Sequence, residues 1–136
     1  MKSILTPPSL CEMAEEARKS AYSPYSGITV GAALLCGSGK VYTGANIENS
    51  AYSPSICAER VAFFKAINDG EREFVRIAIS GGRRGEPPRA SFPPCGVCRQ
   101  VMAEFCNSDF GIIFENGKEL KFSSLLPYGF DKDFIK

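Results

Sequence analysis

The apolar and polar positions along the chain predict a helix near the N-terminus. Apolar residues recur there at the spacing of one helix face, at Leu10, Met13, Ala14, Ala17 and Ala21. The preceding Ser9-Leu10-Cys11-Glu12 has the form of a capping box, in which Ser9 caps the helix and Glu12 bonds back to it. We therefore expect a first helix that begins at Ser9 and turns its apolar stripe toward the core.

Segments rich in β-forming residues predict five strands, at residues 29–36, 41–47, 74–80, 111–114 and 119–122. The first two are joined by Gly37-Ser38-Gly39-Lys40 and the last two by a turn that contains Asn116-Gly117. Asn-Gly is a strong hairpin signal because both residues tolerate a positive φ. Each of these two pairs is therefore expected to be antiparallel.

Two further helices are expected, at residues 57–69 and 95–106. Gly70 is placed to end the first of them, and Pro93 and Pro94 precede the second, where a missing N–H does no harm. Residues 81–94 between strand and helix are rich in proline, glycine and arginine and are expected to form a loop with solvated charges. The order of elements predicts an α/β fold, a three-layer α/β/α sandwich with a mixed five-stranded sheet, in one domain over residues 1–136.

Composition and charge indicate which kinds of molecule the protein can bind. The 136 residues are 44% hydrophobic, which suits one compact core. Sixteen basic and fifteen acidic residues give a net charge of +1, so nothing attracts a polyanion, and we expect a small-molecule substrate and no nucleic acid. No apolar stretch reaches the roughly 20 residues that span a membrane, and residues 1–8 do not resemble a signal peptide. The expected location is the cytoplasm, where the six cysteines would stay reduced.

Two short motifs carry the candidate chemistry. Cys57-Ala58-Glu59 and Pro94-Cys95-Gly96-Val97-Cys98 supply three thiolates in a chain that has no histidine. Three protein ligands leave one position of a tetrahedral Zn²⁺ for water, which is typical of catalytic sites. Cys95 and Cys98 share a helix face, whereas Glu59, two residues after Cys57, cannot point at the same ion. Glu59 is therefore expected to act beside the metal as a proton carrier.

Other interpretations of these cysteines remain open at this point. A C-x-x-C motif also occurs in structural zinc ribbons, in thioredoxin-like redox pairs and in zinc-binding interaction modules without catalysis. A ribbon would need a second C-x-x-C, and a redox pair would need no third thiolate. Three thiolates around Zn²⁺ carry a net charge of about −1, so we expect Arg60, Arg99 or both to bond the sulfurs; the alternative is that they are exposed arginines on helix faces.

Further motifs connect the chain with a known family. Besides both cysteine motifs it carries Tyr-Ser-Pro-Tyr-Ser at 22–26, Val-Gly-Ala-Ala-Leu at 30–34, Asn-Ile-Glu-Asn at 46–49, Ala-Tyr-Ser at 51–53 and Leu-Leu-Pro at 125–127. Over essentially its whole length it resembles the small homotetrameric cytidine deaminases of the cytidine/deoxycytidylate deaminase family. The resemblance implies hydrolytic deamination of cytidine and deoxycytidine at C4, by zinc-activated hydroxide and a glutamate proton shuttle, with release of ammonia, in pyrimidine salvage.

The resemblance also implies roles for individual residues. It makes Cys57, Cys95 and Cys98 the ligands of one Zn²⁺ per subunit and Glu59 the proton shuttle. Asn46 and Glu48 would contact the ribose hydroxyls. The remaining substrate-binding positions are Ala58, Tyr52 and Phe130, of which Phe130 would reach a neighbouring subunit's site, so that active sites are shared within a homotetramer.

One position departs from the family pattern. Ile28 stands where the family usually has a phenylalanine that lines the nucleoside pocket. An aliphatic side chain removes an aromatic face and leaves space, so a deaminase of relaxed specificity, which also acts on N4-substituted cytidines, is the alternative to one confined to cytidine and deoxycytidine. The blasticidin S deaminases are similar in both cysteine motifs and in Leu-Leu-Pro, but Asn46-Ile47-Glu48-Asn49 favours a nucleoside. A polynucleotide-editing deaminase would need a basic, aromatic surface that neither charge nor length provides.

Overall fold

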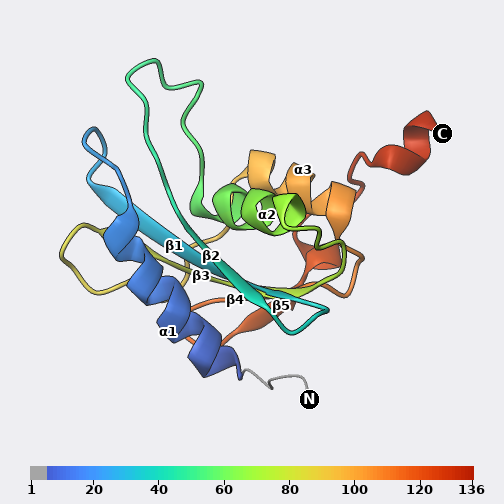
Figure 1. Ribbon diagram of the computed structural model, residues 1–136, viewed down its shortest axis with the longest axis horizontal. Coiled ribbons are helices and arrows are strands. Elements are labelled where there is room, and N and C mark those ends of the chain that lie inside the picture. The colour runs from blue at the N-terminus through green and yellow to red at the C-terminus, as the bar shows by residue number, and fades with distance from the viewer. Residues whose placement is uncertain (1–5) are drawn as a thin grey trace.

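A mixed five-stranded sheet forms the centre of the computed structural model, which describes residues 6–136 (Figure 1). The strand order is β2-β1-β3-β4-β5, and only β3 and β4 pair in parallel. The strands are β1 Ile28–Cys36, β2 Val41–Ala45, β3 Phe74–Arg83, β4 Gly111–Ile113 and β5 Glu119–Lys121. Residues 1–5, part of the segment on which the absence of a signal peptide was judged, lie outside the described residues.

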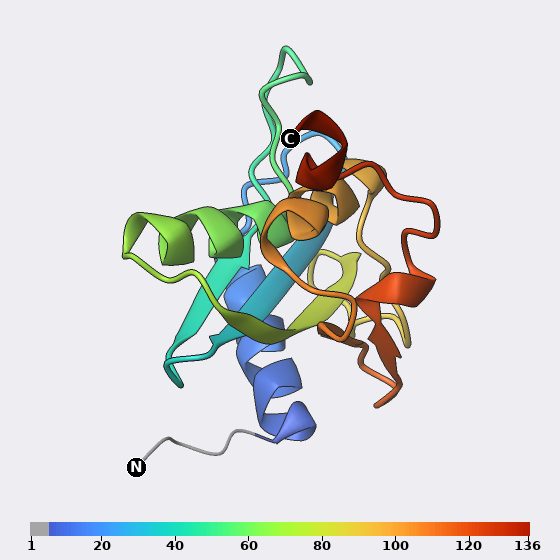
Figure 2. The same ribbon diagram turned by 90° about the vertical axis from the view of Figure 1, so that its right-hand side faces the viewer.

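Helices cover both faces of the sheet, as expected of a three-layer α/β/α sandwich (Figures 1 and 2). Helix α1, Pro7–Ala17, packs Leu10 and Ala14 against one face. Helices α2, Ala58–Asn68, and α3, Gly96–Phe105, lie on the other face, where the larger apolar core includes Phe63 and Met102. Short 3₁₀ helices follow at Arg18–Ser20, Phe122–Ser124 and Lys132–Ile135. None of the described helices is long and apolar enough to cross a membrane.

Two glycines let the helices lie directly on the sheet. A Cβ added at Gly31 of β1 would lie 1.9 Å from the carbonyl oxygen of Ala14 in α1, and one at Gly44 of β2 would lie 2.4 Å from that of Ala58 in α2. No other residue fits at either crossing. The Gly44 contact holds the first turn of α2 against the edge strand, and this turn carries the first cysteine motif.

The structure corrects three predicted boundaries. Helix α1 begins at Pro7, because Thr6 is its N-cap and accepts a hydrogen bond from the Ser9 N–H at 3.3 Å, so the capping box at Ser9 is wrong. Strand β2 ends at Ala45, two residues early. Strand β3 continues three residues beyond 80 because Gly81–Arg83 pair with the start of β1.

Candidate metal centre and active site

Three cysteines converge where α2 and α3 begin. Cys57 is the N-cap of α2, Cys95 is the N-cap of α3, and Cys98 lies in the first turn of α3. The Cys57 and Cys95 sulfurs are 3.5 Å apart and those of Cys95 and Cys98 are 3.6 Å apart. The unpaired N–H groups and the positive dipole end of each helix favour thiolate over thiol at these positions.

This cluster has the donor set of a zinc site. All three sulfurs lie within 4.8 Å of one another, and among residues 6–136 this is the one group of three or more cysteine, aspartate or glutamate ligands with such geometry. Thiolates are soft ligands that select zinc over hard cations, and three of them leave one coordination position open. The residues therefore fit a catalytic zinc better than a closed structural one.

Arg60 contacts the cluster, and Arg99 does not. The Nη2 group of Arg60 donates to the Cys57 sulfur at 3.6 Å. The pKa of Cys57 is lowered by a hydrogen bond from Cys98 and by Arg60, whereas the pKa of Cys98 is raised by the same hydrogen bond and by burial. Arg99 instead donates to the carbonyl oxygens of Pro94 at 2.8 Å and Leu125 at 2.7 Å, which ties α3 to the C-terminal segment. Of the two arginines, only Arg60 bonds a sulfur.

Glu59 is a buried carboxyl with an uncommitted oxygen. Its side chain is 3% exposed, and Oε1 has no hydrogen-bond partner among the described residues. Burial raises the pKa of Glu59 to about 7, and the neighbouring Cys57 charge adds to the rise. A buried polar atom without a partner is costly and points to a ligand or a proton-transfer role. A carboxyl with this pKa can accept or release a proton near neutral pH.

A cavity of about 340 Å³ opens beside these groups. Its walls come from the start of β1, the segment after β2, the start of α2 and the segment before α3. It is lined by Ser26, Ile28, Val30, Asn46, Ile47, Glu48, Ser55, Ile56, Cys57, Glu59, Arg60, Phe92, Pro93 and Cys95. Its size lies within the range of small-molecule sites.

Asn46 and Glu48 line this cavity and are held rigidly. The Asn46 side chain accepts from the Val30 N–H at 2.8 Å and donates to the Ile28 carbonyl at 3.0 Å. These bonds add to the backbone bond from the Asn46 N–H to the Val30 carbonyl at 3.2 Å, just after β2 ends. Glu48 accepts bonds from the Ser26 hydroxyl and from the N–H groups of Tyr25 and Ser26. These bonds, the Ser26 hydroxyl foremost, lower the pKa of Glu48 and keep it ionised.

Three residues expected in the site do not line the cavity of this chain. Ala58, the first residue of α2, is fully buried. Tyr52 is 74% exposed at a positive φ of 61°, with its ring 6.4 Å from that of Tyr25. Phe130 is 58% exposed and stacks on Phe134 at 5.7 Å.

The cavity wall also contains residues that the sequence did not single out, above all Phe92. Its ring lies flat on β3, where a Cβ at Gly81 would come within 2.5 Å of the ring. Phe92 stands directly before Pro93-Pro94-Cys95, so its place next to a ligand motif was a usable signal. The arginines and prolines around it obscured this signal by favouring a solvated loop.

Comparisons with known proteins agree on one family. The family model described as cytidine and deoxycytidylate deaminase zinc-binding region matches residues 7–113. The cytidine deaminase of Sporosarcina psychrophila is 48% identical over 123 residues, with 88% of this chain and 87% of that protein covered. The cytidine deaminase of Halalkalibacterium halodurans is 46% identical, with 89% and 91% covered. The crystal structure of cytidine deaminase from Burkholderia pseudomallei superposes with a TM-score of 0.83 at 39% identity, covering 93% of this chain and 100% of that one.

Replacing Arg60 by glutamine tests its contact with the sulfurs. Without the guanidinium, the thiolates lose a positive neighbour, and we expect zinc affinity to fall about 10- to 100-fold. Competition with a chromogenic chelator measures this directly. Arg89→Gln, an exposed loop position, serves as the control and should retain wild-type affinity. Equal zinc retention in both variants would show that Arg60 does not stabilise the thiolates.

Proposed function

The chain belongs to the cytidine and deoxycytidylate deaminase family, and we propose that it deaminates cytidine and deoxycytidine, with Cys57, Cys95 and Cys98 as zinc ligands and Glu59 as proton carrier. It is a zinc-dependent enzyme, and its reaction is the hydrolytic deamination of cytidine. Water supplies the oxygen that replaces the amino group at C4, and the amine leaves as ammonia. The observation that carries the residue assignment is the buried Glu59 carboxyl, whose Oε1 has no hydrogen-bond partner among the described residues, beside three convergent thiols.

Each protein group has a distinct task in this proposal. Zinc, when bound, polarises a water molecule so that it can attack near neutral pH. Glu59 takes one proton of the attacking water and passes it to the ring nitrogen. It then takes the remaining proton of the new C4 hydroxyl and passes it to the amine, so that the C4 carbonyl forms as the C–N bond breaks and ammonia leaves. Its raised pKa, about 7, suits a group that must both accept and release a proton. With 3% exposure, the carboxyl has little contact with bulk water.

Asn46 and Glu48 are proposed to bind the ribose. Glu48 is ionised and keeps acceptor capacity beyond its bonds to Tyr25 and Ser26, so it can accept a hydrogen bond from a sugar hydroxyl. Asn46 already uses its amide within the chain, and its carbonyl oxygen has a second lone pair for a hydroxyl. Because both side chains are fixed before the substrate arrives, binding costs little side-chain entropy.

Glu59→Gln tests the proton carrier. The amide keeps the shape but cannot shuttle a proton, so we expect kcat to fall by about 10²- to 10⁴-fold while zinc content is unchanged. The fall in ultraviolet absorbance as cytidine becomes uridine follows the reaction. Glu104→Gln, on an exposed position of α3, is the matched control. Activity of Glu59→Gln equal to that control would remove Glu59 from the mechanism.

Ile28 supports a proposal of relaxed specificity. It lines the cavity together with Phe92, so one aromatic wall remains while the Ile28 wall is aliphatic. We infer that the chain also accepts cytidines with a small N4 substituent.

Ile28→Phe fills the space that such a substituent would need. We expect the ratio of kcat/KM for N4-acetylcytidine to that for cytidine to fall about tenfold or more. Val75→Phe, at a 41% exposed position of β3 that does not line the cavity, adds the same ring elsewhere and should leave the ratio as it is. An unchanged ratio in Ile28→Phe would contradict the proposal.

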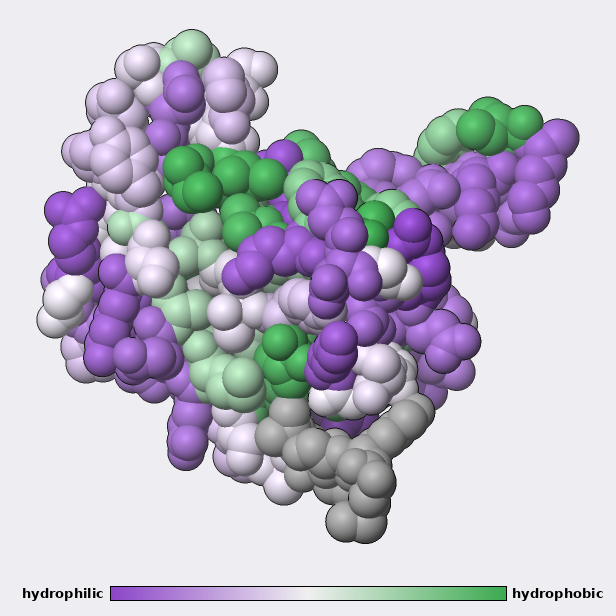
Figure 3. Space-filling view, viewed as in Figure 1, coloured by the Kyte–Doolittle hydropathy of each residue, from purple (hydrophilic) through white to green (hydrophobic). Residues whose placement is uncertain are grey.

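A homotetramer with shared active sites is also proposed. Large apolar side chains are exposed, and Figure 3 shows hydrophobic surface at the tip of the C-terminal segment. The exposed set includes Tyr22, Tyr25, Ile47, Tyr52, Phe130, Phe134 and Ile135. Burial of these side chains would favour association. Cytoplasmic location and a part in pyrimidine salvage remain predictions that follow from the family.

Mixing two inactive variants tests shared sites. Glu59→Gln lacks the proton carrier, and Phe130→Ala would lack the aromatic residue given to a neighbour. If a site combines Glu59 of one subunit with Phe130 of another, some sites in mixed tetramers are intact and activity returns after co-expression. Light scattering should give four times the mass of the chain. A monomer, or no recovery of activity, would refute this assembly.

A further inference from the structure

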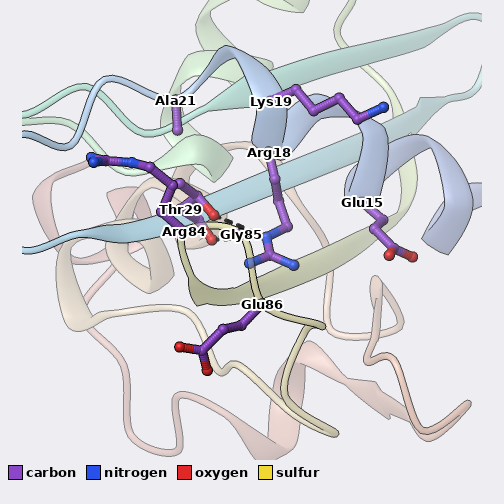
Figure 4. A pocket seen from close by; sticks show the side chains of 8 residues that line it. All are labelled: Glu15, Arg18, Lys19, Ala21, Thr29, Arg84, Gly85 and Glu86. Atoms are coloured by element: carbon purple, nitrogen blue, oxygen red, sulfur yellow. Dashed lines mark hydrogen bonds between the residues drawn. The ribbon is translucent and has the colours of Figure 1, made fainter.

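A second cavity, of about 390 Å³, lies at the end of α1, on the face of the sheet opposite to α2 and α3. It is lined by Glu15, Arg18, Lys19, Ala21, Thr29, Arg84, Gly85 and Glu86 (Figure 4). None of the cysteine ligands and neither Glu59 nor Glu48 belongs to it. The proposed deamination leaves this cavity without a role.

Arg18 points into this cavity from the 3₁₀ turn that follows α1 (Figure 4). Its side chain is only 7% exposed. Nε donates to the carbonyl and hydroxyl oxygens of Thr29, both at 3.1 Å, and Nη2 donates to the Arg83 carbonyl at 3.1 Å. The guanidinium is thus fixed by neutral acceptors on one edge, between β1 and β3.

The charge of Arg18 has no counter-ion among the described residues. No carboxylate of residues 6–136 lies within 4 Å of its guanidinium, although Glu15 and Glu86 line the same cavity. A buried charge without a partner is costly, and buried charges are normally paired. Nη1 makes no hydrogen bond in the described chain and is not among the fully enclosed unpaired atoms, so it faces the cavity.

The free donors of Arg18 suit one kind of ligand. Nη1 and the second proton of Nη2 form the outer edge of a planar fork, which matches two oxygens of a phosphate. Gly82 makes room for this arrangement, because a Cβ there would lie 3.2 Å from Nη2. A cavity of this size has space for a phosphate and a small group attached to it.

We propose that this cavity binds a phosphate group, free or as a sugar phosphate, through the outer edge of Arg18. Lys19 also lines the cavity and adds positive potential, although its ammonium is paired with Glu16 at 2.9 Å. Arg84 lines the wall with its stem, while its guanidinium turns away from Arg18 and donates to Ser23 (Figure 4). Glu15 and Glu86 also line the cavity, and their carboxylates lower its affinity for phosphate because they repel an anion.

Titration calorimetry on the zinc-loaded full chain tests this site. Uridine is kept at saturating concentration, so that binding near Glu59 does not contribute. Wild type should bind inorganic phosphate saturably, and Arg18→Gln should bind it about tenfold more weakly or worse, because a charged bidentate partner is lost. Lys118→Gln, an exposed lysine in the turn between β4 and β5, is the control and should match wild type.

Two further variants keep the test valid if Arg18→Gln does not fold. Glu15 and Glu86 are exposed, so Glu15→Gln and Glu86→Gln should fold normally. Each removes a repelling charge and should tighten phosphate binding about two- to fivefold, the scale of an exposed charge pair. Ribose 5-phosphate that binds more tightly than inorganic phosphate identifies a sugar phosphate as the ligand, and equal affinity identifies free phosphate.

Three results would each overturn the phosphate site: no saturable binding to wild type at millimolar phosphate, equal affinity in Arg18→Gln and Lys118→Gln, or weaker binding in Glu86→Gln. The calorimetric result does not depend on turnover, so deamination can fail or succeed independently of it.

Discussion

The convergence of two helix N-termini on three thiols is the constraint on which the rest of the site depends. Cys57 and Cys95 each cap a helix, so their sulfurs meet where both helix dipoles are positive and backbone N–H groups are unpaired. This arrangement tolerates thiolates that would repel one another elsewhere. It requires α2 to lie directly on β2, and the absence of a side chain at Gly44 makes that contact close enough.

Some polar side chains of the cavity have hydrogen-bond partners within the chain, and others have an atom without one. Asn46 and Glu48 are bonded to the backbone of the segment 25–30, so their orientation is set by the fold. Glu59 has an oxygen without a partner and a pKa raised by burial. Rigid groups suit recognition of a substrate, and the unpaired Oε1 of Glu59, among the described residues that line the cavity, suits proton transfer.

Much of this was predictable from the sequence because it depends on local patterns. The sheet, the helices and the cluster of three cysteines follow from periodicity and motif spacing, and Glu59 follows from its neighbour Cys57. The helix start at Pro7 was missed because two caps, Thr6 and Ser9, compete locally and only the fold selects one. Phe92 was missed because its position depends on contact with Gly81, a residue on another element. The role predicted for Phe130 lies in the site of a neighbouring subunit, which a single chain does not contain.

The contact between Phe92 and Gly81 has a consequence for redesign of this enzyme. The Phe92 ring packs on the backbone of Gly81, so the depth of the cavity depends on a residue that does not line it. A methyl group introduced at position 81 would displace the Phe92 ring into the cavity and reduce the cavity volume. A substitution in β3 could thus change the selectivity for bulky or compact nucleosides without altering the three cysteines or Glu59.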